Sequence, residues 1–206
     1  YPFCTIEPNE GTVAVPDDRI YKLSKIANSK KIIPAPLTFF DIAGLVKGAS
    51  KGEGLGNKFL SHIREVDAII HVVRCFEDDN ITHVNNKIDP VDDVETINTE
   101  LILADLEMIE KLIGNLEKLQ KKGDKDASKK IVIANKILDH LSQGKPARSI
   151  DNIHEQEDEI KEFNLISIKP IIYVCNVDES SIISGNNLTA ALSDEVKDGK
   201  IIIISA

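Results

Sequence analysis

The most chemically suggestive stretch of the chain is an acidic residue at the end of an apolar run, followed by many glycines. Residues 37–40 favour a β-strand, Asp41 comes directly after them, and residues 44–56 hold five glycines. A carboxylate at the end of a strand can hold a water molecule of a bound Mg²⁺. The N–H of a glycine such as Gly44 can approach a terminal phosphate closely, because glycine has no Cβ. The stretch therefore indicates a loop that senses a bound phosphate.

Residues 41–44 have the D-x-x-G layout found in P-loop NTPases. Four residues with two free positions often arise by chance, so an ordinary strand and loop is an equal alternative on these residues alone. The G-x-x-x-x-G-K-[ST] phosphate-binding motif of such enzymes is not found in the chain. Residues 51–56 do not replace it, because no Lys-Ser or Lys-Thr pair follows their glycines.

Polar residues also end two other strand-like runs. Asn176 and Ser205 each come directly after a run of apolar residues. The carboxyl ends of parallel strands meet at one edge of a sheet, and ligands of open α/β proteins bind there. We therefore expect Asp41, Asn176 and Ser205 to lie at one ligand-binding edge.

Three cysteines and a histidine are the other candidate reactive side chains. The cysteines lack metal-ligand spacing. Cys75 and Cys175 lie in apolar strand-like runs, which favours reduced, buried thiols in a cytosolic protein. His71 lies in the apolar run 67–76, which offers it no acid or nucleophile as a partner. We interpret His71 as a satisfied structural histidine and not as a catalytic one.

An alternation of apolar runs and amphipathic stretches provides the framework for these residues. The order of elements predicts an α/β fold with a parallel sheet. Strands are expected at residues 12–15, 37–40, 67–76, 169–176 and 200–206, and helices at residues 16–26, 57–66, 151–161 and 188–196.

A longer helical pattern interrupts this framework. Apolar residues recur at spacings of three and four over residues 97–119, which predicts a helix of about seven turns with a narrow apolar seam. A turn at residues 123–124 and a second pattern at residues 133–141 predict an antiparallel coiled-coil hairpin that ends near Gly144. Residues 81–93 are expected to be a polar linker. The hairpin serves either packing alone or partner binding, and its thin seam favours a projecting arm.

The composition sets outer limits on the function. A chain of 206 residues can bury a substantial core. Its net charge of -9 makes it poorly suited to bind nucleic acid through overall charge, although a local basic patch stays open. We find neither a signal-peptide pattern nor an apolar run of ~18 residues, so the sequence predicts neither export nor membrane insertion.

Beyond these patterns, nearly the whole chain resembles the YchF / Obg-like ATPase family. The stretches that carry the resemblance are residues 1–9, 41–57, 71–76, 98–106, 123–127 and 176–179. The resemblance implies a Ras-like parallel-sheet P-loop NTPase domain at residues 1–90 and 146–206, with the coiled-coil arm inserted at residues 91–145. It also implies a P-loop before Tyr1 and a TGS domain after Ala206. We therefore expect this chain to be the middle part of a longer protein.

The resemblance also assigns roles to single residues. It implies that Thr5 and Asp41 bind Mg²⁺, and that Asp41 and Gly44 take part in catalysis. It further implies a nucleotide-binding set, which comprises Asn176, Val177, Glu179, Ser205 and Ala206.

The base-reading residues depart from the pattern of GTP-binding proteins. Those proteins read N-K-x-D here, and the aspartate accepts hydrogen bonds from N1 and N2 of guanine. This chain has Val177 and Glu179 in place of the lysine and the aspartate. The longer carboxylate misplaces the acceptors that guanine needs, and the resembled family, which shares the departure, is described as preferring ATP. We expect ATP, with GTP as the alternative. Asp178 is a competing acid, so a shifted register stays open.

The expected activity is slow nucleotide hydrolysis. Ras-type enzymes orient the attacking water with a glutamine after D-x-x-G, but Leu45 stands here and cannot bond a water. Catalysis would rest on Mg²⁺ and on backbone donors, with a further group supplied either by a partner or by Lys47, Ser50 or Lys51.

We expect a cytoplasmic switch that associates with the ribosome by family resemblance. The switch has a protein partner on its helical arm and no sequence-specific nucleic-acid binding. The alternative is a non-catalytic, nucleotide-stabilised scaffold that presents the arm. Without a P-loop, residues 1–206 alone are expected to be inactive.

Overall fold

The computed structural model describes residues 9–42, 55–78, 88–153 and 157–206. They fall into two units, residues 1–44 and residues 45–206, which are treated separately. Within the described residues, no helix has both the length and the apolar character needed to cross a membrane.

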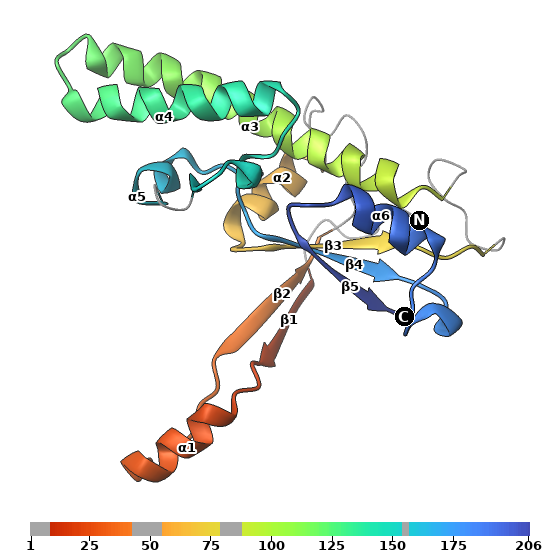
Figure 1. The fold of residues 1–206 in the computed structure, drawn as a ribbon. Coiled ribbons are helices and arrows are strands. Elements are labelled where there is room, and N and C mark those ends of the chain that lie inside the picture. The colour runs from red at the N-terminus through yellow and green to blue at the C-terminus, as the bar shows by residue number, and fades with distance from the viewer. Residues whose placement is uncertain (1–8, 43–54, 79–87, 154–156) are drawn as a thin grey trace. The chain divides into compact units, whose positions relative to one another are not determined.

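The first unit is a β-hairpin with a helix between its strands (Figure 1). Strand β1 (Asn9–Ala14) pairs antiparallel with β2 (Pro36–Asp41). Helix α1 (Asp18–Ala27) begins after Asp17, whose carboxylate accepts the N–H of Arg19 at 2.9 Å. These elements confirm the two strands and the helix expected for this part of the sequence. The strand at residues 37–40 was expected in the parallel sheet, however, and in the described residues it pairs antiparallel with β1 in a sheet of its own.

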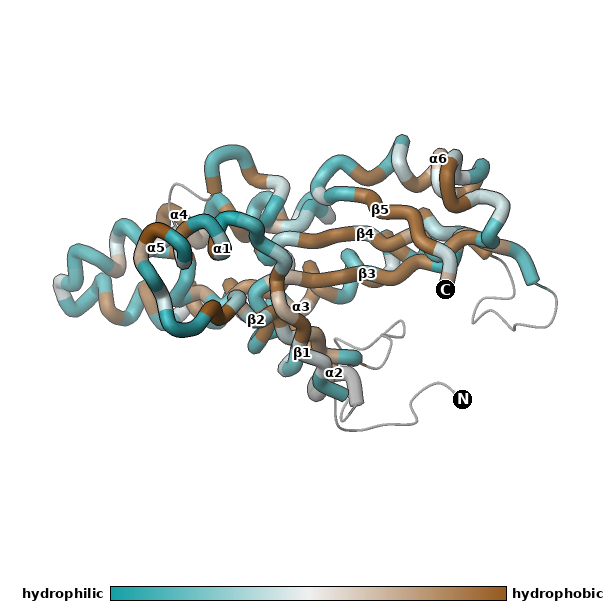
Figure 2. The backbone as a smooth tube through the Cα atoms, turned by 90° about the horizontal axis from the view of Figure 1, so that it is seen from below, coloured by the Kyte–Doolittle hydropathy of each residue, from teal (hydrophilic) through white to brown (hydrophobic). Residues whose placement is uncertain are grey.

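The second unit contains a three-stranded parallel sheet in the order β3-β4-β5. The strands are β3 (Ile69–Arg74), β4 (Ile171–Asn176) and β5 (Lys200–Ile204), and each is hydrophobic along most of its length (Figure 2). Runs rich in isoleucine and valine suit such strands, because branched side chains pack well on a pleated surface. The confirmed α/β class rests on this sheet and on its helices α2 (Leu55–Glu65) and α6 (Asn187–Glu195).

One face of this sheet is covered by helices (Figure 1). Val94 of the long helix α3 (Pro90–Gln120) and Leu192 of α6 pack with Val73, Tyr173 and Cys175 of the strands. The cluster contains both strand cysteines, and the structure gives each as a free, buried thiol. The expectation of reduced, buried thiols is thereby confirmed for Cys175 and for Cys75, which follows β3.

The predicted helical hairpin is confirmed as α3 and α4 (Lys125–Ser142). Gly123 turns the chain with φ +93°, and the Asp124 carboxylate caps α4 by accepting the N–H groups of Asp126 and Ala127. The end of the predicted linker was wrong, because α3 already begins at Pro90. Proline is well tolerated at the first helical position, where no intrahelical partner is needed for its missing N–H. Residues 81–87 of that linker lie outside the described part of the chain.

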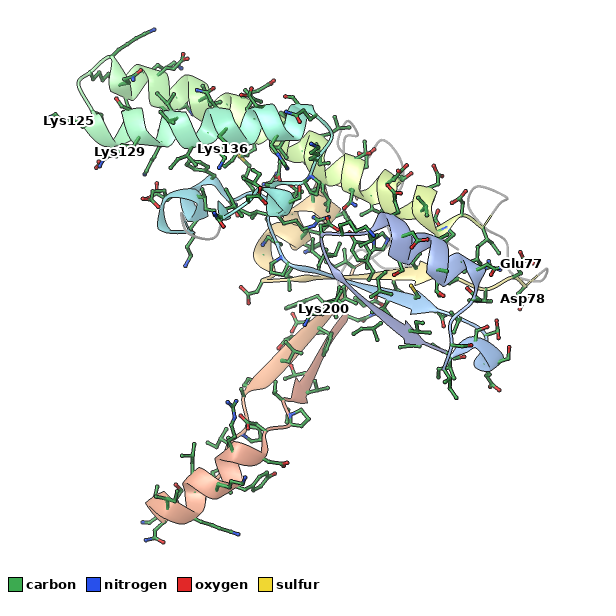
Figure 3. The ribbon with its side chains drawn as sticks, in the orientation of Figure 1. Glu77, Asp78, Lys125, Lys129, Lys136 and Lys200 are labelled. Atoms are coloured by element: carbon green, nitrogen blue, oxygen red, sulfur yellow. The ribbon has the colours of Figure 1, made fainter. Side chains whose placement is uncertain are left out.

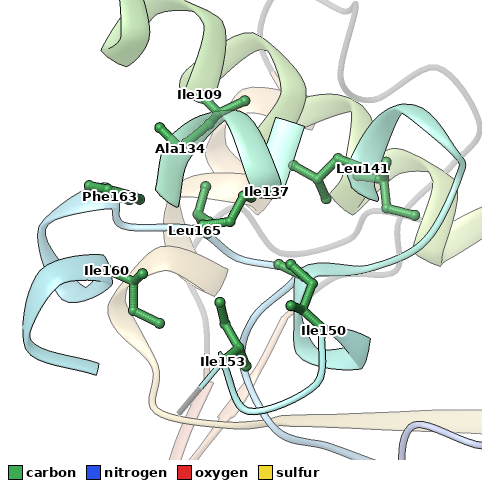
Figure 4. Close-up of a cluster of buried hydrophobic side chains, with 11 residues drawn as sticks. Ile109, Ala134, Ile137, Leu141, Ile150, Ile153, Ile160, Phe163 and Leu165 are labelled. Atoms are coloured by element: carbon green, nitrogen blue, oxygen red, sulfur yellow. The ribbon is translucent and has the colours of Figure 1, made fainter. Parts of the chain in front are cut away.

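The arm is buried more widely at its base than a thin seam would allow. Ile102 and Ile109, which lie beside the predicted seam, are 5% and 0% exposed. They belong to a cluster that the segment after α4 completes (Figure 4). That segment contributes six side chains to the cluster: Ala147, Ile150, Ile153, Ile160, Phe163 and Leu165. The narrow apolar seam predicted for the arm was therefore wrong at the base.

The segment after α4 is mostly irregular, which corrects a second expectation. Among the described residues, the helix predicted at residues 151–161 is present as α5 (Glu157–Ile160), and short 3₁₀ turns are present at η1 (Ala147–Ser149) and η3 (Lys161–Phe163). Residues 154–156 lie outside the described part of the chain. Asn152 has φ +56°, a left-handed conformation that interrupts any helix there. The apolar side chains of this segment pack against the arm, and their spacing in the sequence does not follow a helical period.

A buried carboxylate fixes this segment to α3. Asp105 is 0% exposed and accepts the N–H groups of Ile166 at 2.9 Å and Ser167 at 2.7 Å. Burial raises the pKa of Asp105, and these hydrogen bonds partly oppose that rise. The Ser167 hydroxyl in turn accepts the N–H of Ala147 at 3.1 Å. One acidic side chain thus organises the strand-entry segment against the arm.

A buried arginine ties the arm to the sheet. The side chain of Arg148 is 3% exposed and donates from Nε to Asp198 Oδ2 at 2.7 Å. Its Nη2 donates to Asn98 Oδ1 of α3 at 2.7 Å, and its Nη1 donates to the Ser167 carbonyl at 3.2 Å. The Tyr173 hydroxyl of β4 donates to the other oxygen of Asp198 at 3.2 Å. Arg148 therefore joins the arm, the sheet and the turn before β5.

Candidate functional site

The predicted switch residues are only partly described. Asp41 is the last residue of β2, exposed and opposite Asn9 of β1. Thr5, Gly44 and the loop positions Leu45, Lys47, Ser50 and Lys51 lie outside the described residues. The roles predicted for these residues therefore remain predictions.

The carboxyl edge of the three-stranded sheet brings together the predicted base-reading residues. Asn176 ends β4, and its Oδ1 accepts the N–H of Ala206 at 3.0 Å. Its backbone carbonyl accepts the N–H of Cys75 at 2.8 Å, and the N–H of Val177 donates to Ile204 at 2.9 Å. Backbone and side-chain hydrogen bonds around Asn176 therefore join the carboxyl ends of all three strands. Ser205 lies between β5 and Ala206 at this edge.

Asp178 is committed to a local structural role. Its carboxylate accepts the Ser180 hydroxyl and the N–H and hydroxyl of Ser181, the last two at 3.1 and 3.0 Å. These bonds cap the short turn η4 (Glu179–Ser181), and the bond from Ser180 contributes most to lowering the pKa of Asp178. Glu179 is exposed, and no hydrogen bond of its side chain occurs among the described residues. Of the two acids, Glu179 is the one not used for capping.

Val177 faces inward. Its side chain is 2% exposed and belongs to the cluster beneath the helices. A ligand at the sheet edge could reach this residue through its backbone but not through its side chain. A lysine at this position would have to bring its charged end out of an apolar cluster.

The loop that follows is held by residues that the sequence analysis did not single out. The Asn186 Oδ1 caps α6 by accepting the N–H groups of Leu188 and Thr189, both at 3.0 Å. The Thr189 hydroxyl accepts the N–H of Asn186 at 2.8 Å, which completes a capping box. The Asn186 Nδ2 donates to the Cys75 carbonyl at 2.7 Å. The Asn-x-x-Thr spacing before an apolar run was the signal that could have revealed this cap.

Arg74 shapes the loop after β3. Its guanidinium lies 4.7 Å from the centre of the Phe76 ring and donates to the carbonyls of Phe76 at 3.1 Å and Asp78 at 3.2 Å. Glu77 and Asp78 lie in this loop (Figure 3). A single arginine in an apolar run carried no signal of this role.

His71 is structural, but it is not fully satisfied as predicted. Its Nδ1 is buried, and the described residues offer it no hydrogen-bond partner. The ring lies 5.8 Å from that of Tyr173, centre to centre, on the neighbouring strand. Burial and the charge of Arg148 lower the pKa of His71 to about 4, so the imidazole is neutral at pH 7.

A groove elsewhere in the unit does not contain the predicted site. It has a volume of about 430 Å³ and lies between α3, α6 and the loop after α4, lined in part by Val91, Pro146 and Val196. None of the residues predicted to bind nucleotide or metal lines it.

Mg²⁺ would fit the oxygen donors that the sequence places at the switch. A carboxylate and a hydroxyl are the hard oxygen ligands that this ion prefers. The Asp41 carboxylate is exposed at the end of its strand, where it could reach such an ion. Within the described residues, no group of three or more His, Cys, Asp or Glu side chains could hold a metal.

A parallel sheet with a polar carboxyl edge is typical of nucleotide-binding α/β domains, the class to which P-loop GTPases belong, and here a helical hairpin is inserted between β3 and β4. The comparisons agree with this class. Residues 1–136 match a family described as "50S ribosome-binding GTPase". The structure superposes on that of the Schizosaccharomyces pombe YchF GTPase with a TM-score of 0.76, at 38% identity, covering 100% of this chain and 57% of that one.

The chain belongs to the YchF / Obg-like ATPase family, as the sequence resemblance predicted. It is 53% identical over 210 residues to the Ribosome-binding ATPase YchF of Bacillus subtilis, covering 100% of this chain and 57% of that protein. It is 45% identical over 203 residues to the protein of the same name from Escherichia coli O157:H7, with 98% and 56% coverage. The chain thus spans a little over half the length of these relatives.

Proposed function

We propose that this chain is the nucleotide-binding part of a cytoplasmic, ribosome-associated switch that binds ATP with Mg²⁺ and hydrolyses it slowly, with GTP as the alternative nucleotide. The observation that carries the proposal is the convergence of Asn176, Glu179 and Ala206 at the carboxyl edge of the sheet. Its support from relatives is that two of them are named ribosome-binding ATPases.

Base selection would depend on Glu179. Asp178 is occupied by the capping bonds of η4, so a register in which Asp178 reads the base would break three hydrogen bonds. The Oδ1 of Asn176 is engaged by Ala206, which leaves its Nδ2 to donate to an acceptor on a purine. A site that presents a displaced carboxylate leaves guanine donors unpaired, and this disfavours GTP.

Phosphate chemistry would depend on the first unit. Asp41 and Thr5 would hold Mg²⁺, which supplies charge neutralisation at the phosphates. The N–H of Gly44 would donate to the terminal phosphate. Because Leu45 cannot orient a water, hydrolysis would be slow without a group supplied by a partner. We also propose that residues 1–206 by themselves hydrolyse no nucleotide, since no P-loop motif grips the phosphates.

The base-reading proposal is tested by Glu179→Asp in the natural full-length protein. The shorter carboxylate restores the acceptor geometry that guanine uses, so the ratio of ATP to GTP dissociation constants should shift toward GTP, by about tenfold or more. Binding of fluorescent ATP and GTP analogues measures this ratio. Val177→Lys is introduced only together with Glu179→Asp. Because residue 177 is buried, a thermal melt checks that this double variant still folds. Unchanged selectivity of a folded Glu179→Asp protein would contradict the proposal.

The second candidate is a nucleotide-stabilised scaffold that presents the arm to a protein partner. It is favoured by the fixed base of the arm, which bonds of Arg148 and Asp105 hold to the rest of the unit. Multiple-turnover phosphate release that needs Mg²⁺ would exclude this candidate. Stoichiometric binding of ATP without turnover would support it against the switch.

A further inference from the structure

The loop after β4 is tied to the sheet at both of its ends. Residues 177–185, here called the recognition loop, connect β4 to α6 (Figure 1). At the start of the loop, the N–H of Val177 donates to the Ile204 carbonyl of β5 at 2.9 Å. Directly after the loop, Asn186 donates from Nδ2 to the Cys75 carbonyl at 2.7 Å. Both ends of the recognition loop are therefore held against the strands.

Contacts inside the recognition loop restrict it further. The N–H of Gly185 donates to the Ser181 carbonyl at 2.7 Å, and the Asp178 carboxylate caps η4, which begins at Glu179. Gly185 has φ +70°, and a Cβ at this position would lie 2.5 Å from Oγ1 of Thr189, closer than the two atoms can approach. The recognition loop is thus folded on itself and packed on α6, and it presents Glu179 from a well-defined backbone.

Asn186 is connected to the base-reading residues through Cys75. The carbonyl of Cys75 accepts the bond from Asn186, and the N–H of Cys75 donates to the Asn176 carbonyl at 2.8 Å. The Oδ1 of Asn176 in turn accepts the N–H of Ala206 at 3.0 Å. A series of hydrogen bonds therefore runs from the N-cap of α6 across the ends of the three strands to Ala206.

The bond from Asn186 to Cys75 is separate from the capping of α6. The Oδ1 of Asn186 accepts the N–H groups of Leu188 and Thr189, which serine or aspartate could do equally well. The other polar atom of the amide, Nδ2, makes the bond to Cys75. An ionised aspartate has no donor, and the single hydroxyl of serine is shorter and already serves the cap. The bond to the sheet therefore needs asparagine at this position, whereas the cap does not.

We propose that Asn186 is a positioning residue for base recognition, which holds the recognition loop and Asn176 in the arrangement that binds the nucleotide base. The inference rests on the proposed function, in which Glu179 selects the base, and it adds the residue that fixes this geometry. Placement matters because a misplaced acceptor leaves a donor of the base unpaired. An edge that is ordered before the nucleotide arrives also loses no binding energy to ordering the loop.

The test is Asn186→Ser in the natural full-length protein, with Asp124→Ser as the matched control. The first variant keeps a good N-cap on α6 but removes the bond to Cys75. The control makes the corresponding exchange at the N-cap of α4, whose capping bonds stay within the arm. Thermal melts check that both variants fold.

The quantity measured is the ratio of the GTP to the ATP dissociation constant, from binding of fluorescent analogues. Asn186→Ser should lower this ratio about five- to tenfold, the effect of about one misplaced hydrogen bond. Asp124→Ser should leave it unchanged. A general loss of folded protein would weaken the binding of both nucleotides equally and would not move the ratio. In hydrolysis by the intact protein, Asn186→Ser should raise KM for ATP and leave kcat unchanged, because the residues proposed to act on the phosphates belong to the first unit.

A double-mutant cycle shows whether Asn186 acts through Glu179. In a Glu179→Ala background, Asn186→Ser should change the ratio no further, since the carboxylate that it positions is gone. A further change in that background would overturn the inference. An unchanged ratio in a folded Asn186→Ser protein would also overturn it, while the proposed function would stand. No effect of Glu179→Ala on the ratio would contradict both the base-reading role of Glu179 and the positioning role of Asn186.

Discussion

At the scale of single residues, the sheet keeps a histidine neutral by burying it. His71 lies on β3 beside Tyr173, with a buried Nδ1 that has no partner among the described residues. Adding a proton there would place a charge in an apolar setting near the guanidinium of Arg148. Both effects act in the same direction, so the folded state resists protonation of this ring far below the usual pKa of histidine.

This burial predicts a specific pH dependence of stability. The pKa of His71 is about 4 in the folded protein, against the ordinary histidine value of 6.5 that applies to the unfolded chain. Between these values the unfolded state binds more protons, so the contribution of His71 to stability is present above pH 6.5 and is lost as pH falls toward 4. At about pH 4.5 the loss should be about 2.5 kcal/mol.

The measurement is urea unfolding of wild type and His71→Phe at about pH 7 and about pH 4.5. The phenylalanine variant should lose less stability on acidification by the predicted amount, because it has no ring nitrogen to protonate. At pH 7 it should differ little from wild type, since it removes an unpaired buried nitrogen. Equal acid sensitivity of both proteins would show that the proton binds elsewhere.

Sequence reasoning located the residues of the sheet edge but could not see their partners. Asn176 and Ser205 could be placed at strand ends because apolar runs precede them. Asp178 caps the turn because the hydroxyls of Ser180 and Ser181 donate to its carboxylate. The sequence spacing alone does not show whether these hydroxyls point toward Asp178. His71 was expected to be satisfied because most buried polar groups are. Nothing in an apolar run tells which nitrogen lacks a partner.

At the scale of elements, α3 is the helix on which both clusters depend. Its first turns pack on the sheet through Val94, and its middle packs on the segment after α4 through Ile102 and Ile109. Between Ile102 and Ile109, the Asp105 carboxylate accepts hydrogen bonds from two backbone N–H groups. The helix therefore needs a specific acid at one position, in addition to its apolar face.

Replacing Asp105 should destabilise the protein far more than replacing a nearby acid on the same helix. Asp105→Ala leaves two buried N–H groups without an acceptor and should cost about 2 to 5 kcal/mol. Glu107→Ala is the matched control, because Glu107 is exposed and pairs only with Lys111 among the described residues, and it should cause no measurable loss. Guanidinium denaturation of both variants decides the point. Similar midpoints would mean that the backbone bonds of Asp105 are replaced by water.

The elements themselves were predicted well where a single period dominated. The strands of the sheet are short apolar runs, and the hairpin shows a regular helical repeat. Residues 151–161 were misassigned as one helix because the apolar residues there serve a tertiary contact with the arm and not a helical face. The left-handed Asn152 also carries no clear signal, since asparagine occurs in both helices and turns.

At the scale of the second unit as a whole, Arg148 is the point where three parts meet. Its guanidinium bonds Asn98 of the arm and Asp198 before β5, and Asp198 is bonded by Tyr173 of the sheet. The pair is almost completely removed from water, with Arg148 3% and Asp198 16% exposed. A motion of the arm relative to the sheet would have to break these bonds together.

Arg148→Ala should therefore be strongly destabilising. It leaves Asp198 buried without its counterion, a loss of about 3 to 5 kcal/mol by analogy with other buried pairs. Lys130→Ala removes the partner of Glu162 in an exposed pair at the arm, and no measurable change is expected. Thermal and urea unfolding compare the two, and Arg148→Lys, which keeps the charge but not the planar fork, should fall between them. Equal stability of the two alanine variants would refute a central role for Arg148.

The same bond from Arg148 to Asn98 bears on how the chain finds its fold. Strands β3 and β4 pair although about 100 residues separate them, as the match of Ile69 with Ile171 shows. Asn98 and Arg148 are 50 positions apart and meet at the base of the arm. Once the hairpin has formed from its local contacts, Asn98 and Arg148 are already close together. The loop that must still close to pair β3 with β4 is then about half as long. Halving a loop lowers the entropic cost of closing it by about 0.6 kcal/mol, so early formation of the hairpin should speed the pairing of β3 with β4 roughly threefold.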